Sequence, residues 1–352
     1  MSYLVGNLAC EVAWAGGPPV PAAVGDRLAR LATTLRALAT DADTLWLPGP
    51  VADAAVPPGG PRPRLVTGPV APADQPVVAW GADAALDARP PGPAASVDAG
   101  TWQAAVRTLP VATVALARAA NDRRLALAVA ADLGTALPGA QVIASVAELR
   151  DHLAAGGAAA SPTGTWVAKA VLTAAGRDRV RRRGPAIDAA TAVRLERLLA
   201  RHQALVVEPW MERRLDVGQG GVVLGPGQAL LLPPHRAACD GAGVVRALTV
   251  DDGAALAGPH RAALAQAAAA VAHRLGATGY RGPFVVDAFV HADGFHPLCE
   301  INARLTFGMV ARAWAEHLGR PITLGLDGAP PAGATPLVLD AAGRPAAWWA
   351  PA

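Results

Sequence analysis

Residues 283–304, PFVVDAFVHADGFHPLCEINAR, contain two apolar runs that are separated by the dipeptide Asp293-Gly294. This dipeptide is favoured in two-residue hairpin turns, so the segment predicts a pair of antiparallel strands. With Asp293 and Gly294 as the two turn residues, Asp287 in the first strand lies directly opposite Glu300 in the second.

The facing carboxylates indicate a site for a cation. Like charges that face each other across a strand pair are destabilising unless a positive charge lies between them. Strand alternation places Asn302 on the same face as Glu300 and turns Ile301 toward the core. Oxygen ligands of this kind suit Mg²⁺, with Mn²⁺ as an alternative. The plainer reading is an edge aspartate and a solvated glutamate. The register and the rare asparagine favour metal binding by Asp287, Glu300 and Asn302.

The composition bounds the class of protein. A chain of 352 residues is long enough for two domains or three small ones. The hydrophobic fraction of 52% is mostly alanine, and its runs are interrupted by Gly, Pro or Arg, so no membrane span is expected. Residues 1–17 lack the pattern of a signal peptide, and we expect a cytoplasmic protein. Three scattered cysteines exclude a disulfide framework, and a net charge of +3 gives no support for a nucleic-acid partner.

Rare residue types single out further positions. Thirty of the 31 basic residues are arginine, and Lys169 is the only lysine. We interpret the excess of Ala, Gly, Pro and Arg as a compositional bias, so residues that resist it mark positions where chemistry or packing demands them. All three asparagines and all four phenylalanines belong to this group: Asn7, Asn121, Asn302, Phe284, Phe289, Phe295 and Phe307.

Hydrophobic periodicity predicts the elements of the chain. We expect a small α/β domain over 1–110 and a tail over 326–352 that could form a hairpin. The segment 233–244, which contains His235, is expected to be a surface connection, with a lining of the acceptor site as the alternative. Helices are expected over 26–39, 121–133, 189–201 and 258–275, and strands over 44–47, 77–80, 165–172, 204–208, 216–224 and 229–232.

The residues from about 115 to 315 resemble the ATP-grasp superfamily. The family's closing hairpin has an Asp in one strand and Glu-x-Asn in the next, often followed by Arg, which here are Asp287, Glu300, Asn302 and Arg304. The resemblance implies an α/β (α+β) fold. In it a small N-terminal α/β domain precedes a lid subdomain over 111–207 and a catalytic subdomain over 208–325, which hold the nucleotide between two antiparallel sheets.

The resemblance also implies a nucleotide site. Lys169 matches a phosphate-binding lysine, and a compact ammonium fits between phosphates where the wider guanidinium of arginine does not. Arg123 or Arg124 takes the place of a second phosphate-binding residue. A loop over 174–184 would close over the triphosphate, although a solvated basic turn is the alternative. The implied contacts to phosphates, adenine and ribose are Arg123, Lys169, Gly176, Arg177, Glu208, Trp210, Met211 and Asp216.

The activity that the resemblance implies is ATP-dependent ligation of a carboxylate to an amine through an acylphosphate, with release of ADP and phosphate. Arg304 and Lys169 would be the catalytic residues, and both substrates would be small molecules. A homodimer is one alternative for the assembly. Other readings are an enzyme that phosphorylates or carboxylates a small molecule, a nucleotide-binding regulatory module without turnover, and an RNA-binding protein that uses the arginine-rich loop.

Overall fold

A computed structural model of the chain describes residues 1–70, 75–87, 101–160, 163–173, 178–241, 243–326 and 329–352. Its N-terminal part is a parallel four-stranded sheet in the order β3-β2-β1-β4. The helix expected over 26–39 is present, although its second half is a 3₁₀ helix. The elements are β1 (Tyr3–Val5), α1 (Cys10–Trp14), α2 (Ala22–Ala32), η1 (Thr33–Leu38), β2 (Thr44–Trp46), η2 (Asp53–Ala55), β3 (Arg64–Val66), β4 (Val77–Ala79) and α3 (Ala84–Asp87).

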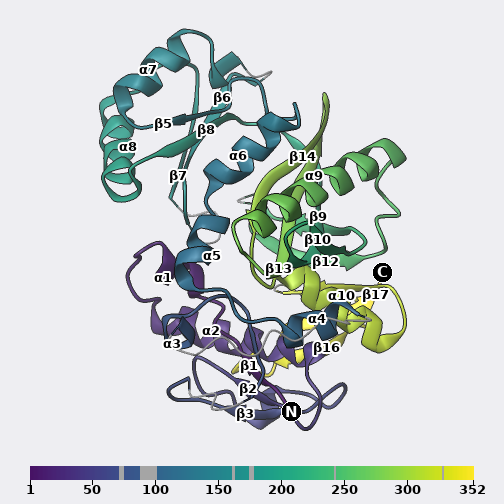
Figure 1. The fold of residues 1–352 in the computed structure, drawn as a ribbon. Coiled ribbons are helices and arrows are strands. Elements are labelled where there is room, and N and C mark those ends of the chain that lie inside the picture. Colours follow the sequence, from purple (N-terminus) through teal and green to yellow (C-terminus); the bar gives the residue numbers. More distant parts are fainter. Residues whose placement is uncertain (71–74, 88–100, 161–162, 174–177, 242, 327–328) are drawn as a thin grey trace.

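Three helices lead from this domain to a small antiparallel sheet in the order β5-β8-β6-β7, at the top of Figure 1. Alternate residues of β6, such as Trp166 and Ala168, pack into a core with α7 and α8. Lys169 therefore lies on the opposite face. The elements are α4 (Trp102–Thr108), α5 (Val114–Ala120), α6 (Arg123–Asp132), β5 (Gln141–Ile143), α7 (Val146–Ala154), η3 (Ala158–Ala160), β6 (Thr165–Ala170), β7 (Arg179–Arg183), α8 (Ala189–His202) and β8 (Leu205–Pro209).

The rest of the chain forms a large antiparallel sheet in the order β14-β13-β9-β11-β12-β15-β17-β16, with β10 paired to β9. Its two faces pack against α9 and α10. Residues of the expected tail form the antiparallel pair β16–β17, and β17 also pairs with β15. The elements are β9 (Arg213–Gly225), β10 (Gln228–Leu231), β11 (His235–Cys239), β12 (Val245–Val250), α9 (Gly258–Ala277), β13 (Gly282–His291), β14 (Gly294–Asn302), α10 (Phe307–Leu318), β15 (Ile322–Gly325), β16 (Thr335–Leu339) and β17 (Pro345–Pro351).

The N-terminal domain packs against α10 and against the segment that precedes this helix. Trp80 and Trp314 belong to one continuous apolar core that joins the two regions. The Trp314 indole donates a hydrogen bond of 3.1 Å to the carbonyl of Thr34, and the Leu305 amide donates one of 2.9 Å to the carbonyl of Trp80. The segment between β14 and α10 is thereby held against the N-terminal domain.

The structure corrects two sequence-based expectations. Residues 179–183, expected in a loop, form the edge strand β7, in which Val180 is buried in the core of the small sheet and the other four residues are arginines. The segment that contains His235, expected to be a surface connection, supplies the interior strand β11. Within the described residues, no helix is long and apolar enough to cross a membrane.

Candidate active site between two antiparallel sheets

The hairpin β13–β14 pairs Asp287 with Glu300, as predicted, but its turn differs from the prediction. His291 pairs with Gly294, so the turn residues are Ala292 and Asp293. Between the pairs Phe289–His296 and Asp287–Glu300, three residues of β14 oppose a single residue of β13. This irregularity brings Asp287 opposite Glu300 although the turn is displaced by one residue. Pro297, which has no backbone N–H, lies in this irregular stretch.

Asp287 is the less compensated member of the acid pair, because Glu300 forms an ion pair with Arg123. Burial, together with the nearby charge of Glu300, raises the pKa of Asp287 from 3.8 to about 7, against the opposing effects of Arg304 and Asn302. The amide nitrogen of Asn302 donates a hydrogen bond of 2.8 Å to Oδ2 of Asp287. The two facing carboxylates are hard oxygen donors that fit a divalent cation, and rotation of the Asn302 amide would add its oxygen, which here accepts from Arg304. Among the described residues, no group of three or more His, Cys, Asp or Glu side chains forms a metal site of another kind.

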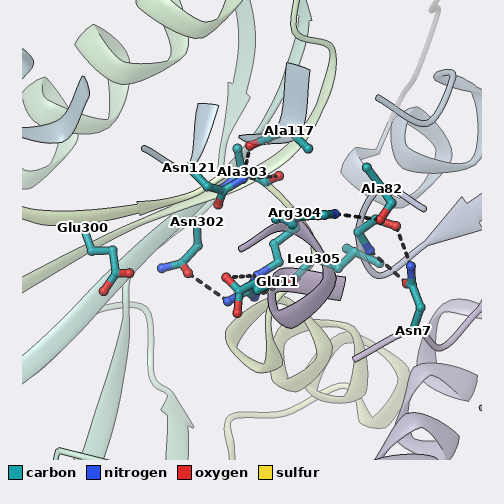
Figure 2. Close-up of polar contacts among 12 residues, drawn as sticks. Asn7, Glu11, Ala82, Ala117, Asn121, Glu300, Asn302, Ala303, Arg304 and Leu305 are labelled. Atoms are coloured by element: carbon teal, nitrogen blue, oxygen red, sulfur yellow. Dashed lines mark hydrogen bonds and ion pairs between the residues drawn. The ribbon is translucent and has the colours of Figure 1, made fainter. Parts of the chain in front are cut away.

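Arg304 connects Asn302 to Glu11 of the N-terminal domain, as Figure 2 shows. Its Nη2 donates a hydrogen bond of 2.9 Å to Oδ1 of Asn302, and its Nε donates one of 2.9 Å to Oε1 of Glu11 in α1. Burial lowers the pKa of Arg304, but the charge and hydrogen bond of Glu11, together with the nearby Glu300, outweigh it and the pKa is raised. The amide oxygen of Asn302 thus faces Arg304, while its nitrogen faces Asp287.

Asn121 fixes the segment next to this site (Figure 2). Its Nδ2 donates a hydrogen bond of 2.7 Å to the carbonyl of Ala117, and its Oδ1 accepts one of 2.9 Å from the Ala303 amide. Together with Asn7, which bonds the backbone of Gly81, all three asparagines of the chain are buried and hydrogen-bonded. The three asparagines therefore hold segments of the chain together in and next to the site.

Of the two candidate arginines at the start of α6, Arg123 faces the acid pair. Its Nη2 forms an ion pair of 2.7 Å with Oε1 of Glu300, and its Nη1 donates a hydrogen bond of 2.7 Å to the carbonyl of Ala170 at the end of β6. Arg124 instead pairs with Asp122 and is largely exposed. Arg123 thus links the small sheet to the large sheet.

Lys169 forms a buried ion pair with Glu208, a contact that sequence analysis missed. Burial opposes both charges, but their mutual attraction is stronger, so the pKa of Lys169 is raised and that of Glu208 is lowered. The strand register explains the contact, because Val167 pairs with Glu208 and lies on the same face as Lys169. In the sequence, only the alternation of apolar and polar residues in these two strands could have indicated that Lys169 and Glu208 share a face.

The segment after β8 carries the expected adenine contacts. The Trp210 amide donates a hydrogen bond of 2.8 Å to the carbonyl of Thr165, and the guanidinium of Arg181 lies 4.6 Å from the centre of the Trp210 ring. Met211 follows directly and is half-buried, and Asp216 in β9 pairs with Arg213 at 2.9 Å. A cavity of about 420 Å³ is lined by Thr163, Thr165, Arg181, Arg182, Arg183, Trp210 and Glu212. Gly176 and Arg177 lie outside the described residues.

Comparisons with known proteins match this architecture. The N5-carboxyaminoimidazole ribonucleotide synthetase of Thermus thermophilus matches with a TM-score of 0.56 and 14% identity, over 100% of this chain and 94% of that chain. The N5-carboxyaminoimidazole synthetase of Staphylococcus aureus, solved with ADP, matches with a TM-score of 0.51 and 9% identity, over 92% and 81%. The chain has an ATP-grasp fold.

Other matches are partial. The ADP complex of purK, also an N5-carboxyaminoimidazole ribonucleotide synthetase, has a TM-score of 0.44 and 15% identity, with 59% of this chain and 56% of that chain covered. The chain thus spans about half the length of some of the proteins that it matches. No protein-family model matches the sequence, and no curated protein does. The expected fold class is confirmed, because a parallel N-terminal sheet precedes two antiparallel sheets in an ATP-grasp fold.

Proposed function

We propose that this protein is an ATP-dependent ligase that joins a carboxylate to an amine and releases ADP and phosphate. The observation that carries the proposal is the position of Arg123. Its guanidinium bridges the end of β6 and the Glu300 carboxylate of the acid pair. This contact supports a single site in which the proposed phosphate-binding residues lie next to the proposed metal-binding residues. The ATP-grasp fold supports the same reading.

Different residues would contact different parts of the nucleotide. Glu208, Trp210 and Met211 would contact adenine, and Asp216 would contact the ribose. Lys169, Arg123, Gly176 and Arg177 would bind the phosphates. Mg²⁺, or Mn²⁺ in its place, would be held by Asp287, Glu300 and Asn302, and when bound it would supply positive charge to the phosphate oxygens.

The proposed reaction has two steps. A carboxylate oxygen attacks the γ-phosphorus of ATP, and the bond to the bridging oxygen of ADP breaks to give an acylphosphate. The amine then attacks the acyl carbon, phosphate leaves with the bonding electron pair, and the nitrogen loses a proton. Lys169 would offset the charge that develops on the transferred group, and Arg304 would stabilise the oxyanion of the tetrahedral intermediate.

Product analysis tests this proposal. Purified protein is incubated with Mg²⁺-ATP and pools of amino acids, small carboxylic acids and bicarbonate, and ADP, AMP and phosphate are resolved. We expect ADP and phosphate that depend on both a carboxylate and an amine. AMP formation would contradict the acylphosphate mechanism. ADP and phosphate that depend on bicarbonate together with an acceptor, and on no other carboxylate, would instead indicate carboxylation of that acceptor.

A further inference from the structure

The edge strand β7 carries a row of arginines on the face of the small sheet that holds Lys169. In the register of β6 with β7, three pairs lie on this face: Thr165 with Arg183, Val167 with Arg181, and Lys169 with Arg179. Side chains on one face of a strand follow each other at about 6.8 Å. The row therefore leads from the proposed phosphate-binding lysine to the cavity beside Trp210, whose lining includes Arg181 and Arg183.

Arg181 and Arg183 lack a carboxylate partner within the described ranges. Both residues are exposed, and the guanidinium of Arg181 lies over the ring of Trp210 instead of beside an acid. The lining of the cavity contains three arginines and a single carboxylate, that of Glu212. This excess of positive charge favours an anionic ligand.

The backbone of β7 also has groups that point away from the sheet. Two hydrogen bonds beside the ends of the strand set the pattern: Ala170 N–H to the carbonyl of Asp178 at 3.0 Å, and Gly184 N–H to the carbonyl of Gly164 at 2.7 Å. Because bonded residues alternate along an antiparallel pair, the even-numbered residues of β7 bond β6. The N–H and C=O groups of Arg179, Arg181 and Arg183 therefore point outward.

These outward groups are only partly paired. The carbonyl of Arg179 accepts a hydrogen bond of 2.8 Å from the side chain of Arg194, and the carbonyl of Arg181 accepts an exposed one of 3.0 Å from Arg182. The N–H groups of Arg181 and Arg183 and the carbonyl of Arg183 have no partner in the described part of the chain. The edge thus offers both donors and an acceptor to another strand.

We propose that the β7 surface, made of Arg181, Arg183 and Trp210, docks an extended acidic segment of a partner protein. A strand that adds to β7 bonds the outward backbone groups and places every second side chain beside the arginines. Carboxylates at alternate residues of an extended chain repeat at about 6.8 Å, which is the spacing of the arginine row. A small anion would bond the guanidinium groups but would leave the carbonyl of Arg183 without a donor.

Two other occupants fit this surface less well. A second copy of β7 would bring arginines opposite arginines, so the same charges that attract an acidic strand oppose pairing between copies of this chain. Binding of single-stranded nucleic acid relies on several aromatic side chains on which bases stack. Among the described residues that line the cavity, Trp210 is the single aromatic one, and Arg181 lies over its ring.

Fluorescence anisotropy with dye-labelled peptides tests the proposal on the full chain. One peptide alternates glutamate and threonine along its length, and the other has the same composition with its glutamates in one block. We expect saturable binding of the alternating peptide, at least about 10-fold tighter than that of the block peptide. Equal affinity for the two peptides would indicate general charge attraction and would overturn the proposal. Tighter binding of a labelled oligothymidylate would also overturn it, in favour of nucleic acid.

Arg183→Glu reverses one charge of the β7 surface. The residue is exposed, so we expect the melting temperature to stay near that of the wild type while affinity for the alternating peptide falls at least about 10-fold. Arg150→Glu on the exposed face of α7 changes the net charge by the same amount and should bind the peptide normally. Unchanged affinity in Arg183→Glu, or an equal loss in Arg150→Glu, would overturn the proposal.

Discussion

The two sheets that flank the candidate site handle buried charge in opposite ways. In the small sheet, Lys169 and Glu208 neutralise each other, and each shifts the pKa of its partner toward the charged form. In the large sheet, two carboxylates face each other, and the pKa of Asp287 rises toward the neutral form. Arg123 pairs with Glu300, but the charge of Asp287 is less compensated than either charge of the small sheet. This difference separates the proposed metal site from the proposed phosphate site.

The largest effect is expected for Glu300→Gln, which removes half of the acid pair. Turnover should fall by at least about 1000-fold, because a metal site contributes several kcal/mol of charge stabilisation. The melting temperature should stay near that of the wild type. Steady-state ADP release measures the effect, with Glu196→Gln on the exposed face of α8 as the matched control. A folded Glu300→Gln enzyme with normal turnover would remove the metal assignment.

Lys169→Arg tests the small sheet. The wider guanidinium does not fit the space in which the ammonium meets Glu208, so we expect ATP affinity to fall by about 10- to 100-fold, or roughly 1.4–2.7 kcal/mol. Calorimetric titration with ATP in the absence of the carboxylate and the amine measures the change. Arg124→Lys, an exchange at an exposed ion pair, serves as the control and should bind normally. Near-normal affinity in Lys169→Arg would show that a compact charge is not needed there.

Asp287→Asn should reveal the uncompensated charge through the pH dependence of stability. The folded protein holds a proton on Asp287 up to about pH 7, whereas the unfolded chain releases it near pH 3.8. The folded state therefore binds more protons between these values, and this carboxyl makes the free energy of unfolding decrease as pH rises. The variant lacks this decrease, so its stability advantage over the ligand-free wild type should be larger at pH 8 than at pH 5. Thermal unfolding at the two pH values measures it, and an equal difference at both would contradict the raised pKa.

The smallest effect is expected for Arg181→Leu, which removes the guanidinium from the Trp210 ring. An exposed cation–π contact contributes about 0.5–1 kcal/mol, so ADP affinity should change by only about 2- to 5-fold. Tryptophan fluorescence during ADP titration reports the change. Arg194→Leu on α8 is the control, and a loss of affinity as large as that of Lys169→Arg would place Arg181 among the phosphate-binding groups.

The sequence predicts local elements and the pairing of adjacent strands better than it predicts contacts between distant segments. The pairing of Asp287 with Glu300 was correct, although the predicted turn was wrong, because an irregularity in β14 restores the register that the turn alone would have shifted. Only the structure reveals the bond between Arg304 and Glu11, which joins residues 293 positions apart. The strand β7 was missed because its run of arginines resembles a solvated loop, while the single buried Val180 gives a weak signal.

Transfer of ¹⁸O tests the central claim most directly. A carboxylate that supports ADP formation is labelled with ¹⁸O in both oxygens and incubated with the enzyme, Mg²⁺-ATP and the amine. Phosphorylation of the carboxylate predicts one ¹⁸O in each released phosphate, because the attacking oxygen leaves with the phosphoryl group. Phosphate without the label, or label found in AMP, would contradict an acylphosphate intermediate.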